Sequence, residues 1–289
     1  MAHSKQLIKE LEEKAQQLRM DALKMIHRRG HGHPGGALSA AEIITALFFH
    51  HLKIDPDHPD WKNRSRFILS KGHACAILYP ALARRGYFPI DDLKSWGHIG
   101  SHLQAHPDRL KTPGIEMTTG FLGHGISIGV GLCLAARLKG LDYHVYVLVG
   151  DGECQSGVLW EGVMSASKYR LSKLVVILDY NNVQLDGFVD EIMPLEPIKK
   201  KWESFNWKTI EINGHNIKEV LEALDNAKES KNKPTVIIAH TIKGKGVSFM
   251  ENKAEWHGKA PDDKEYAQAI EELTRNGHSE DLSLKNLKI

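Results

Sequence analysis

The sequence has few cysteines, no membrane-length apolar run and almost no excess charge. Its 289 residues include only 3 cysteines, Cys75, Cys133 and Cys154, which lie far apart and form no C-x-x-C pair. An odd number of cysteines without such a pair argues against a disulfide framework and a zinc ribbon. It favours a reducing compartment, so we expect a cytoplasmic protein.

Charge and hydropathy exclude two classes of partner. The net charge is +2, and no basic run is long enough to indicate nucleic acid binding. The apolar runs at 145–149 and 174–178 have the length of strands, and residues 1–29 mix glutamates with lysines instead of forming an apolar signal segment. We therefore expect neither nucleic acid nor a membrane as a partner.

Histidine is the residue type that is present in number, with 17 copies. The 42% of apolar and 26% of charged residues are otherwise ordinary for a globular protein. Histidines in this number are either incidental or mark a site that handles protons, metals or phosphates near neutral pH.

Short β-branched runs alternate with helical stretches along the chain. Apolar residues at helical spacing predict a first helix that ends at Arg29, and Ser39 with Glu42 has the spacing of a capping box that opens a second helix toward His50. Strands are predicted at 66–70, 143–149, 174–179, 208–212 and 235–240, and helices at 74–85, 158–169, 198–205 and 217–229.

This alternation predicts an α/β fold with a doubly wound, mostly parallel sheet and helices on both faces. No repeat or linker divides the chain, so we expect a single domain over residues 1–289, with a polar and flexible tail after about residue 274. Such sheets bind ligands outside the carboxyl ends of their strands.

Two motifs match known residue patterns but lie in the wrong structural context. Residues 30–35 read G-x-G-x-x-G but follow a helix, whereas a dinucleotide fingerprint follows a strand. His98, His102 and His106 have the spacing of one helical face, but Gly97, Gly100 and Pro107 argue against a helix there and so against a helical zinc site.

A Gly-Asp-Gly triplet at Gly150, Asp151 and Gly152 follows the strongest predicted strand, and Asn181 follows the next one. If these strands are neighbours, about 5 Å apart, the carboxylate and the amide oxygen can share a hard cation. Mg²⁺ completes its octahedron with waters and phosphates, so the pair implies a diphosphate ligand. The alternative interpretation is an N-cap aspartate and a turn asparagine.

The spacing of these residues is that of the thiamin diphosphate signature, because 28 residues, 153 to 180, separate Gly-Asp-Gly from Asn181. Five motifs stand in the order found in transketolases: residues 32–35 (GHPG), 69–74 (LSKGHA), 118–123 (TTGFLG), the Gly-Asp-Gly and Asn-Asn pair, and 256–258 (WHG). The sequence resembles the transketolase family over about residues 15–265.

The resemblance covers the amino-terminal, diphosphate-binding half of a transketolase. It implies one subunit of a split enzyme, whose carboxyl-terminal partner subunit carries the pyrimidine-binding domain in a heterotetramer. The pair would use thiamin diphosphate and Mg²⁺, with Ca²⁺ or Mn²⁺ able to substitute, to transfer a two-carbon unit between sugar phosphates, with xylulose 5-phosphate as the default donor. The glutamate that activates the cofactor belongs to the other half, so we expect no turnover from this chain alone.

The resemblance also implies roles for individual residues. The metal ligands would be Asp151, Asn181 and the backbone carbonyl of Val183. The diphosphate would meet His73, Gly150, Gly152, Asn181 and His257, and the aminopyrimidine would meet Gly120 and Leu122. His33, His106 and His257 would face the substrate channel as catalytic groups, binding hydroxyls and moving protons.

Three residues depart from the family pattern: Phe121, where small residues are usual, His124, where Gln is common, and Ser156, where many relatives carry Glu. That glutamate joins a carboxylate network between active sites, of which Glu161 is the remaining member here.

Two alternative functions stay open. One is another thiamin diphosphate enzyme, such as a 1-deoxyxylulose-phosphate synthase or a 2-oxo acid dehydrogenase component, and the other is a non-catalytic relative on the same fold.

Overall fold

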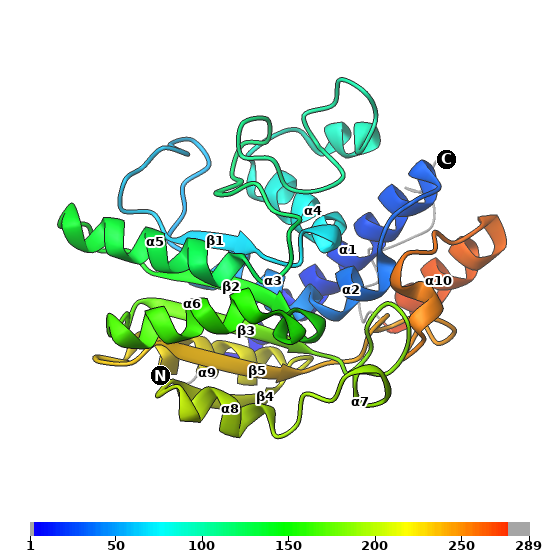
Figure 1. Ribbon diagram of the computed structural model, residues 1–289. Coiled ribbons are helices and arrows are strands. Elements are labelled where there is room, and N and C mark those ends of the chain that lie inside the picture. Colours follow the sequence, from blue (N-terminus) through cyan, green and yellow to red (C-terminus); the bar gives the residue numbers. More distant parts are fainter. Residues whose placement is uncertain (1–2, 277–289) are drawn as a thin grey trace.

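A five-stranded parallel sheet forms the centre of the computed structural model, which describes residues 3–276 (Figure 1). The strands are β1 (Arg66–Leu69), β2 (Val145–Gly150), β3 (Leu174–Tyr180), β4 (Lys208–Asn213) and β5 (Thr235–His240). Their order in the sheet is β1-β2-β3-β5-β4, and every neighbouring pair is parallel. The predicted α/β fold with a parallel sheet is confirmed.

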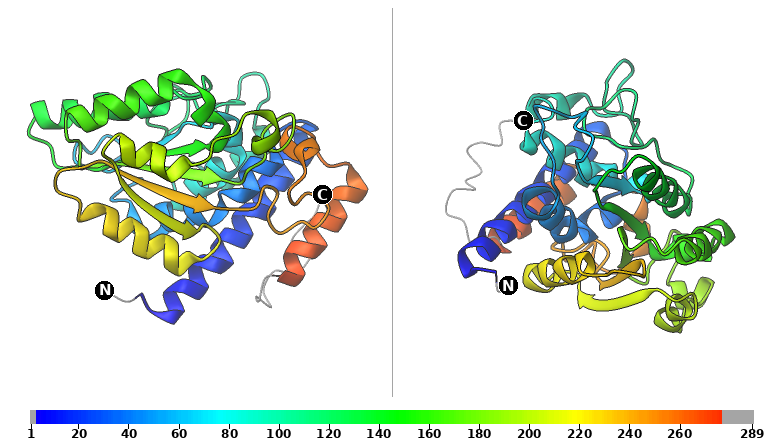
Figure 2. Two further views of the ribbon diagram at one scale, coloured as in Figure 1. Left: turned by 60° about the horizontal axis from the view of Figure 1, so that its bottom comes forward. Right: turned by 90° about the vertical axis from the view of Figure 1, so that its left-hand side faces the viewer.

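Helices cover both faces of the sheet, as Figures 1 and 2 show. One face packs against α1 (Lys5–Arg29), α3 (Ala41–Ala46), α4 (Cys75–Arg85) and α9 (Ile217–Lys228). The other packs against α5 (Gly125–Leu138), α6 (Gly157–Lys168) and α8 (Ile198–Ser204). The remaining α-helices are α2 (Pro34–Ser39), α7 (Val189–Ile192) and α10 (Asp263–Asn276), and α10 packs against α1. Short 3-10 or π-helical segments lie at Leu47–His51, Gly72–Ala74, Ile90–Ser95, Asp151–Gln155 and Ala254–His257.

Helix α1 ends where the sequence predicts. The Ser4 side chain accepts a hydrogen bond from the Leu7 N–H at the start of the helix. At the other end Gly30 adopts a left-handed conformation with φ of 67°, which glycine reaches without steric cost. The segment 30–36 follows, and its Gly36 carbonyl accepts from Lys71, which forms an ion pair with Asp179 near the carboxyl end of β3.

The predicted capping box at Ser39 and Glu42 is wrong. The helical segment already begins at Pro34, and Ser39 is the last residue of α2. Its hydroxyl donates to the Gly36 carbonyl and to Asp179, 140 residues away, while Glu42 pairs with Arg19. Both side chains are buried. They form hydrogen bonds with residues far away in the sequence instead of capping a helix as the local pattern predicts.

Helix α5 is absent from the prediction because its sequence contains Gly125, Gly129 and Gly131, which lower helix propensity. A Cβ at Gly129 would come 2.9 Å from Leu174 and 3.0 Å from Val147, so the glycine allows the helix to lie close to the sheet. Helices α2, α7 and α10 were likewise not predicted.

The carboxyl-terminal tail and the three cysteines were also the subject of predictions. The predicted polar tail lies outside the described residues, apart from 274–276, which form the last turn of α10. All three cysteines are free and buried. Among residues 3–276, no helix combines the length and the apolar character that crossing a membrane requires.

A buried ion pair joins α1 to α3. The two terminal nitrogens of the Arg19 guanidinium, Nη1 and Nη2, donate to the Glu42 carboxylate at 2.6 Å, and Nδ1 of His215 lies 2.9 Å from the same group. Nε2 of His215 accepts from the Ile242 N–H at 2.8 Å, so the chain of contacts reaches the loop after β5. Burial opposes the charge on Glu42, but Arg19 and His215 outweigh it and hold its pKa at about 2, below its usual 4.5.

Replacing Glu42 with glutamine is expected to lower the free energy of unfolding by about 3 kcal/mol at pH 7. Because the folded-state pKa is depressed, the carboxylate stabilises the fold fully above pH 4.5, and this contribution is lost as the pH falls toward about 2. Urea titrations across this range should show the two stability curves converging in acid. Curves that stay parallel would contradict the assignment, and Glu222→Gln, on the exposed side of α9, is the control.

Candidate functional site

The carboxyl ends of β2 and β3 bring the two predicted cation ligands together. In the sheet register Gly150 pairs with Asp179, so Asp151 and Asn181 leave adjacent strands at the same edge. The predicted adjacency of the two strands is confirmed. The strand order also reverses beside β3, where β5 inserts between β3 and β4, and this is where open α/β sheets bind ligands.

Asp151 is held by three backbone N–H groups. One carboxylate oxygen accepts from Gly152 at 2.8 Å, and the other accepts from Asn181 at 3.0 Å and Asn182 at 2.6 Å. The side chain is only 4% exposed. Burial, followed by the like charge of Asp179, raises its pKa to about 6. A cation at this edge would offset both the cost of burying the Asp151 charge and its repulsion by Asp179.

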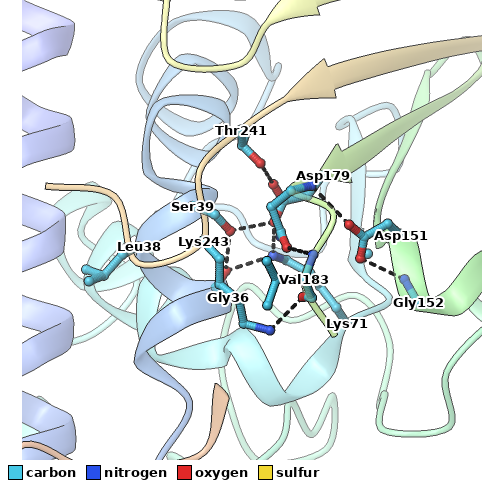
Figure 3. A network of polar contacts seen from close by, with 12 residues as sticks. Gly36, Leu38, Ser39, Lys71, Asp151, Gly152, Asp179, Val183, Thr241 and Lys243 are labelled. Carbon is cyan, nitrogen blue, oxygen red and sulfur yellow. Dashed lines mark hydrogen bonds and ion pairs between the residues drawn. The ribbon is translucent and has the colours of Figure 1, made fainter. Parts of the chain in front are cut away.

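The other two predicted ligands lie next to Asp151. The side-chain oxygen of Asn181 accepts from the Val183 N–H at 3.1 Å. The carbonyl of Val183 accepts from the ammonium of Lys243 at 2.7 Å, so a cationic group already contacts one predicted metal ligand (Figure 3). Burial lowers the pKa of Lys243 to about 8 although Asp151 opposes the shift.

This donor set fits a hard divalent cation. It offers a carboxylate, an amide oxygen and a carbonyl oxygen, which are the ligand types of Mg²⁺, Mn²⁺ and Ca²⁺. Within residues 3–276 no cluster of three or more His, Cys, Asp or Glu side chains could hold a metal. A cation at the ends of β2 and β3 would therefore need further oxygens from water and from an anionic ligand.

Three predicted histidines form a cluster at the same edge. The ring centroids of His33 and His73 are 5.1 Å apart, those of His73 and His257 5.1 Å, and those of His33 and His257 5.5 Å. Nδ1 of His257 lies 2.8 Å from the Lys243 ammonium. Lys243 thus links the histidine cluster to the Val183 carbonyl.

Burial keeps these imidazoles neutral at pH 7. It lowers the pKa of His33 to about 4, with help from His106, and that of His257 to about 3, with help from Lys243. The pKa of His73 also falls well below its usual value, first through burial and then through His257. Because Lys243 donates to Nδ1 of His257, the proton of that neutral ring is on Nε2, where it can be donated to an anion.

The segment 118–124 carries the remaining predicted contacts. His106 lies near enough to His33 to lower the pKa of that ring, and a Cβ at Gly120 would come 3.6 Å from the His106 ring. Leu122 is 43% exposed and Phe121 is 85% exposed, with the ring of Phe121 edge-on to His124. Ser156, the third departure from the family pattern, lies against Gly123, and Glu161 is exposed on α6.

Sequence reasoning missed a buried charge network beneath the site. Asp179, with no exposed surface, forms an ion pair with Lys71 and accepts from Ser39 and Thr241 (Figure 3). Lys71 also donates to the Gly36 carbonyl at 2.7 Å. The network ties α2, β3 and the loops after β1 and β5 to one another. The motif around Lys71 was noted in the sequence, but nothing there marked its partner, 108 residues away.

Gly35 lets the backbone of α2 lie close to Lys243 and Trp256. A Cβ at Gly35 would come 2.9 Å from both the Lys243 side chain and the Trp256 carbonyl, so any side chain would displace them. The Gly35 carbonyl accepts from Gly244 at 3.0 Å. Gly35, the last residue of the 32–35 motif, therefore allows Lys243 to pack against the segment that carries His33.

Comparison with known proteins identifies the relatives of this chain. Residues 11–281 match the family described as "Transketolase, thiamine diphosphate binding domain". The chain is 43% identical to the 6-deoxy-6-sulfo-D-fructose transketolase subunit SqwG of Clostridium sp., covering 93% of this chain and 98% of that protein. It is 38% identical to an apulose-4-phosphate transketolase subunit of Phocaeicola vulgatus, covering 92% and 95% respectively.

Solved structures show the same fold within longer chains. The transketolase of Leishmania mexicana superposes with a TM-score of 0.87 at 32% identity, covering 96% of this chain and 42% of that one. The chain thus spans less than half the length of that enzyme but nearly the whole length of the two bacterial subunits.

Proposed function

The chain belongs to the transketolase family as a thiamin diphosphate-binding domain, and from this membership we propose that it is the diphosphate-binding subunit of a two-chain transketolase. With its partner it transfers a two-carbon ketol unit from a ketose phosphate to an aldose phosphate. The observation that carries the proposal is the meeting of Asp151, Asn181 and Val183 beside the histidine cluster at the carboxyl edge of the sheet.

We assign the cation and diphosphate to this edge. Asp151, Asn181 and the Val183 carbonyl would hold Mg²⁺, for which Mn²⁺ or Ca²⁺ can substitute. The backbone at Gly150 and Gly152 leaves room for the diphosphate, since a Cβ at either residue would meet nothing closer than 3.7 Å. Lys243 would offset further negative charge, and His73 and His257 would donate ring N–H groups.

Thiamin diphosphate, when bound, would supply the thiazolium carbon at which the ketol unit is carried. The protein's own contribution is orientation and proton handling. His33 and His257 are partly buried, which keeps them neutral, and they can hydrogen-bond substrate hydroxyls and exchange a proton at a ring nitrogen. His106 would act from beside Gly120, and Gly120 with Leu122 would contact the aminopyrimidine.

A partner subunit would complete the site. The exposed side chains of Phe121 and Leu122 leave apolar surface beside the predicted cofactor segment. We propose that a subunit carrying the pyrimidine-binding domain covers it in a heterotetramer, and that the glutamate which activates the cofactor comes from that subunit. Three free, buried cysteines support the cytoplasm as the location.

A transketolase assay tests the proposal. The purified chain, a chain bearing the pyrimidine-binding domain from the same source, and their mixture are each supplied with thiamin diphosphate, Mg²⁺ and an aldose phosphate. Donors are xylulose 5-phosphate and the two ketoses for which the bacterial relatives are named. Turnover is expected only in the mixture. Turnover of the isolated chain, or none in a stable complex with any donor, would overturn the proposal.

A further inference from the structure

Glu153 connects three segments that converge on the site. It lies in the short turn 151–155 after β2 and is 2% exposed. One carboxylate oxygen accepts from the Gly150 N–H at 2.9 Å, at the end of β2. The other accepts from the Gly123 N–H at 2.7 Å and from the Ser70 hydroxyl at 2.5 Å, which follows β1.

These contacts fix the distance between two parts of the predicted cofactor site. Gly150 belongs to the segment assigned to the diphosphate, whereas Gly123 directly follows Leu122 in the segment assigned to the aminopyrimidine. Ser70 strengthens the link, since its hydroxyl oxygen also accepts from the Gly125 N–H at 3.3 Å, at the start of α5. One buried carboxylate therefore holds both segments in register with the sheet.

The far side of the same segment is held differently. A Cβ at Gly72 would come 2.7 Å from the Thr119 hydroxyl, and the Thr119 N–H donates to the Pro107 carbonyl at 3.2 Å. Between these points Phe121 and Leu122 are exposed. Without the bond to Gly123, the exposed stretch would lose its nearest hydrogen bond to the sheet on the α5 side, where the Gly125 contact with Ser70 lies two residues further on, while the contacts of Asp151 would stay intact.

We propose that Glu153 is a positioning residue that sets the affinity of this chain for the ring portion of thiamin diphosphate, independently of its affinity for the diphosphate. The proposal rests on the proposed function. Glu153 itself contacts neither ring nor phosphate in this account. It acts through the backbone of Gly123, which orients Leu122 and Gly120.

Glu153→Gln tests the proposal because an amide has one acceptor oxygen and cannot keep both N–H contacts. Gly150 stays paired with Asp179 in the sheet, whereas Gly123 lies outside the strands, so the segment 118–124 is the part expected to move. Calorimetric titration of the full chain, alone and with its partner subunit, compares thiamin diphosphate with inorganic pyrophosphate, both with Mg²⁺. We expect the variant to bind thiamin diphosphate about tenfold more weakly and pyrophosphate with little change. Equal losses for both ligands, or no loss for either, would overturn the proposal.

Hydrogen exchange without ligand provides a second, independent readout. The amides of Gly123 and Gly125 should exchange faster in Glu153→Gln than in the wild type, whereas Glu222→Gln, an exposed change on α9, should leave them unchanged. Ser70→Ala, which keeps the Gly123 bond, should have a smaller effect, and it serves as the test variant if Glu153→Gln fails to fold. Unchanged exchange at Gly123 would refute the positioning role. If the wild-type complex bound neither ligand while exchange changed as expected, the proposed function would fail and the structural link would stand.

Discussion

Replacement of Asp151 by alanine is expected to weaken Mg²⁺-dependent binding of thiamin diphosphate by at least about 100-fold. Asp151 is the only carboxylate among the three predicted cation ligands, and Mg²⁺ binds proteins mainly through one or two carboxylates. Without it, Asn181 and the Val183 carbonyl would offer the cation no negative charge. Calorimetric titrations with and without EDTA measure the effect.

Two further variants separate charge from structure at Asp151. Asp151→Asn keeps one acceptor oxygen, which can serve the N–H groups of Asn181 and Asn182, but removes the negative charge. It should also lose Mg²⁺-dependent binding, while its melting temperature should lie closer to the wild type than that of Asp151→Ala. Asp142→Ala, an exposed change before β2 at the opposite end of that strand, should bind normally. Normal cofactor binding by Asp151→Asn would show that its carboxylate is not a metal ligand.

Replacement of Asp179 by alanine is expected to destabilise the fold by about 3–5 kcal/mol, because it leaves the buried ammonium of Lys71 without its counter-ion. Burial opposes ionisation of Asp179, but the charge of Lys71 outweighs it and lowers the pKa of the carboxyl. The hydroxyls of Ser39 and Thr241 would also lose their acceptor. Chemical denaturation at pH 7 measures the loss.

A double-mutant cycle tests whether the ion pair causes that loss. Lys71→Met alone should also destabilise, but in the Asp179→Ala background it should cost at least about 2 kcal/mol less, since no unpaired charge remains. Additive effects would contradict the coupling. The pair lies beneath Gly36 and Ser39, so the single variants should also loosen the segment that carries His33.

The polar edge of the site was predictable because its residues stand where strongly apolar strands end. The β-branched runs before Asp151 and Asn181 predicted parallel neighbours, and the sheet register places the two residues side by side. Glycines beside Asp151 marked a close approach to an anion. The prediction depended on local sequence and on one general property of parallel sheets, so it needed no long-range information.

The charges beneath that edge were not predictable in the same way. Nothing in the sequence marks the partners of Lys71, Lys243 and Asp179. Only the tertiary structure buries Lys71 against Asp179, 108 residues away, and Lys243 against the Val183 carbonyl, 60 residues away. The capping box at Ser39 and Glu42 was wrongly predicted for the same reason. Both side chains form hydrogen bonds with residues far away in the sequence instead of along their own helix.

The most direct test of the account is to locate the metal. Crystals of this chain with its partner subunit, grown with Mn²⁺ and thiamin diphosphate, would show the cation in an anomalous difference map. We expect one peak at the carboxyl ends of β2 and β3, within coordination distance of the Asp151 carboxylate, the Asn181 side-chain oxygen and the Val183 carbonyl. Bound cofactor with its cation elsewhere, or with no cation at this edge, would contradict it.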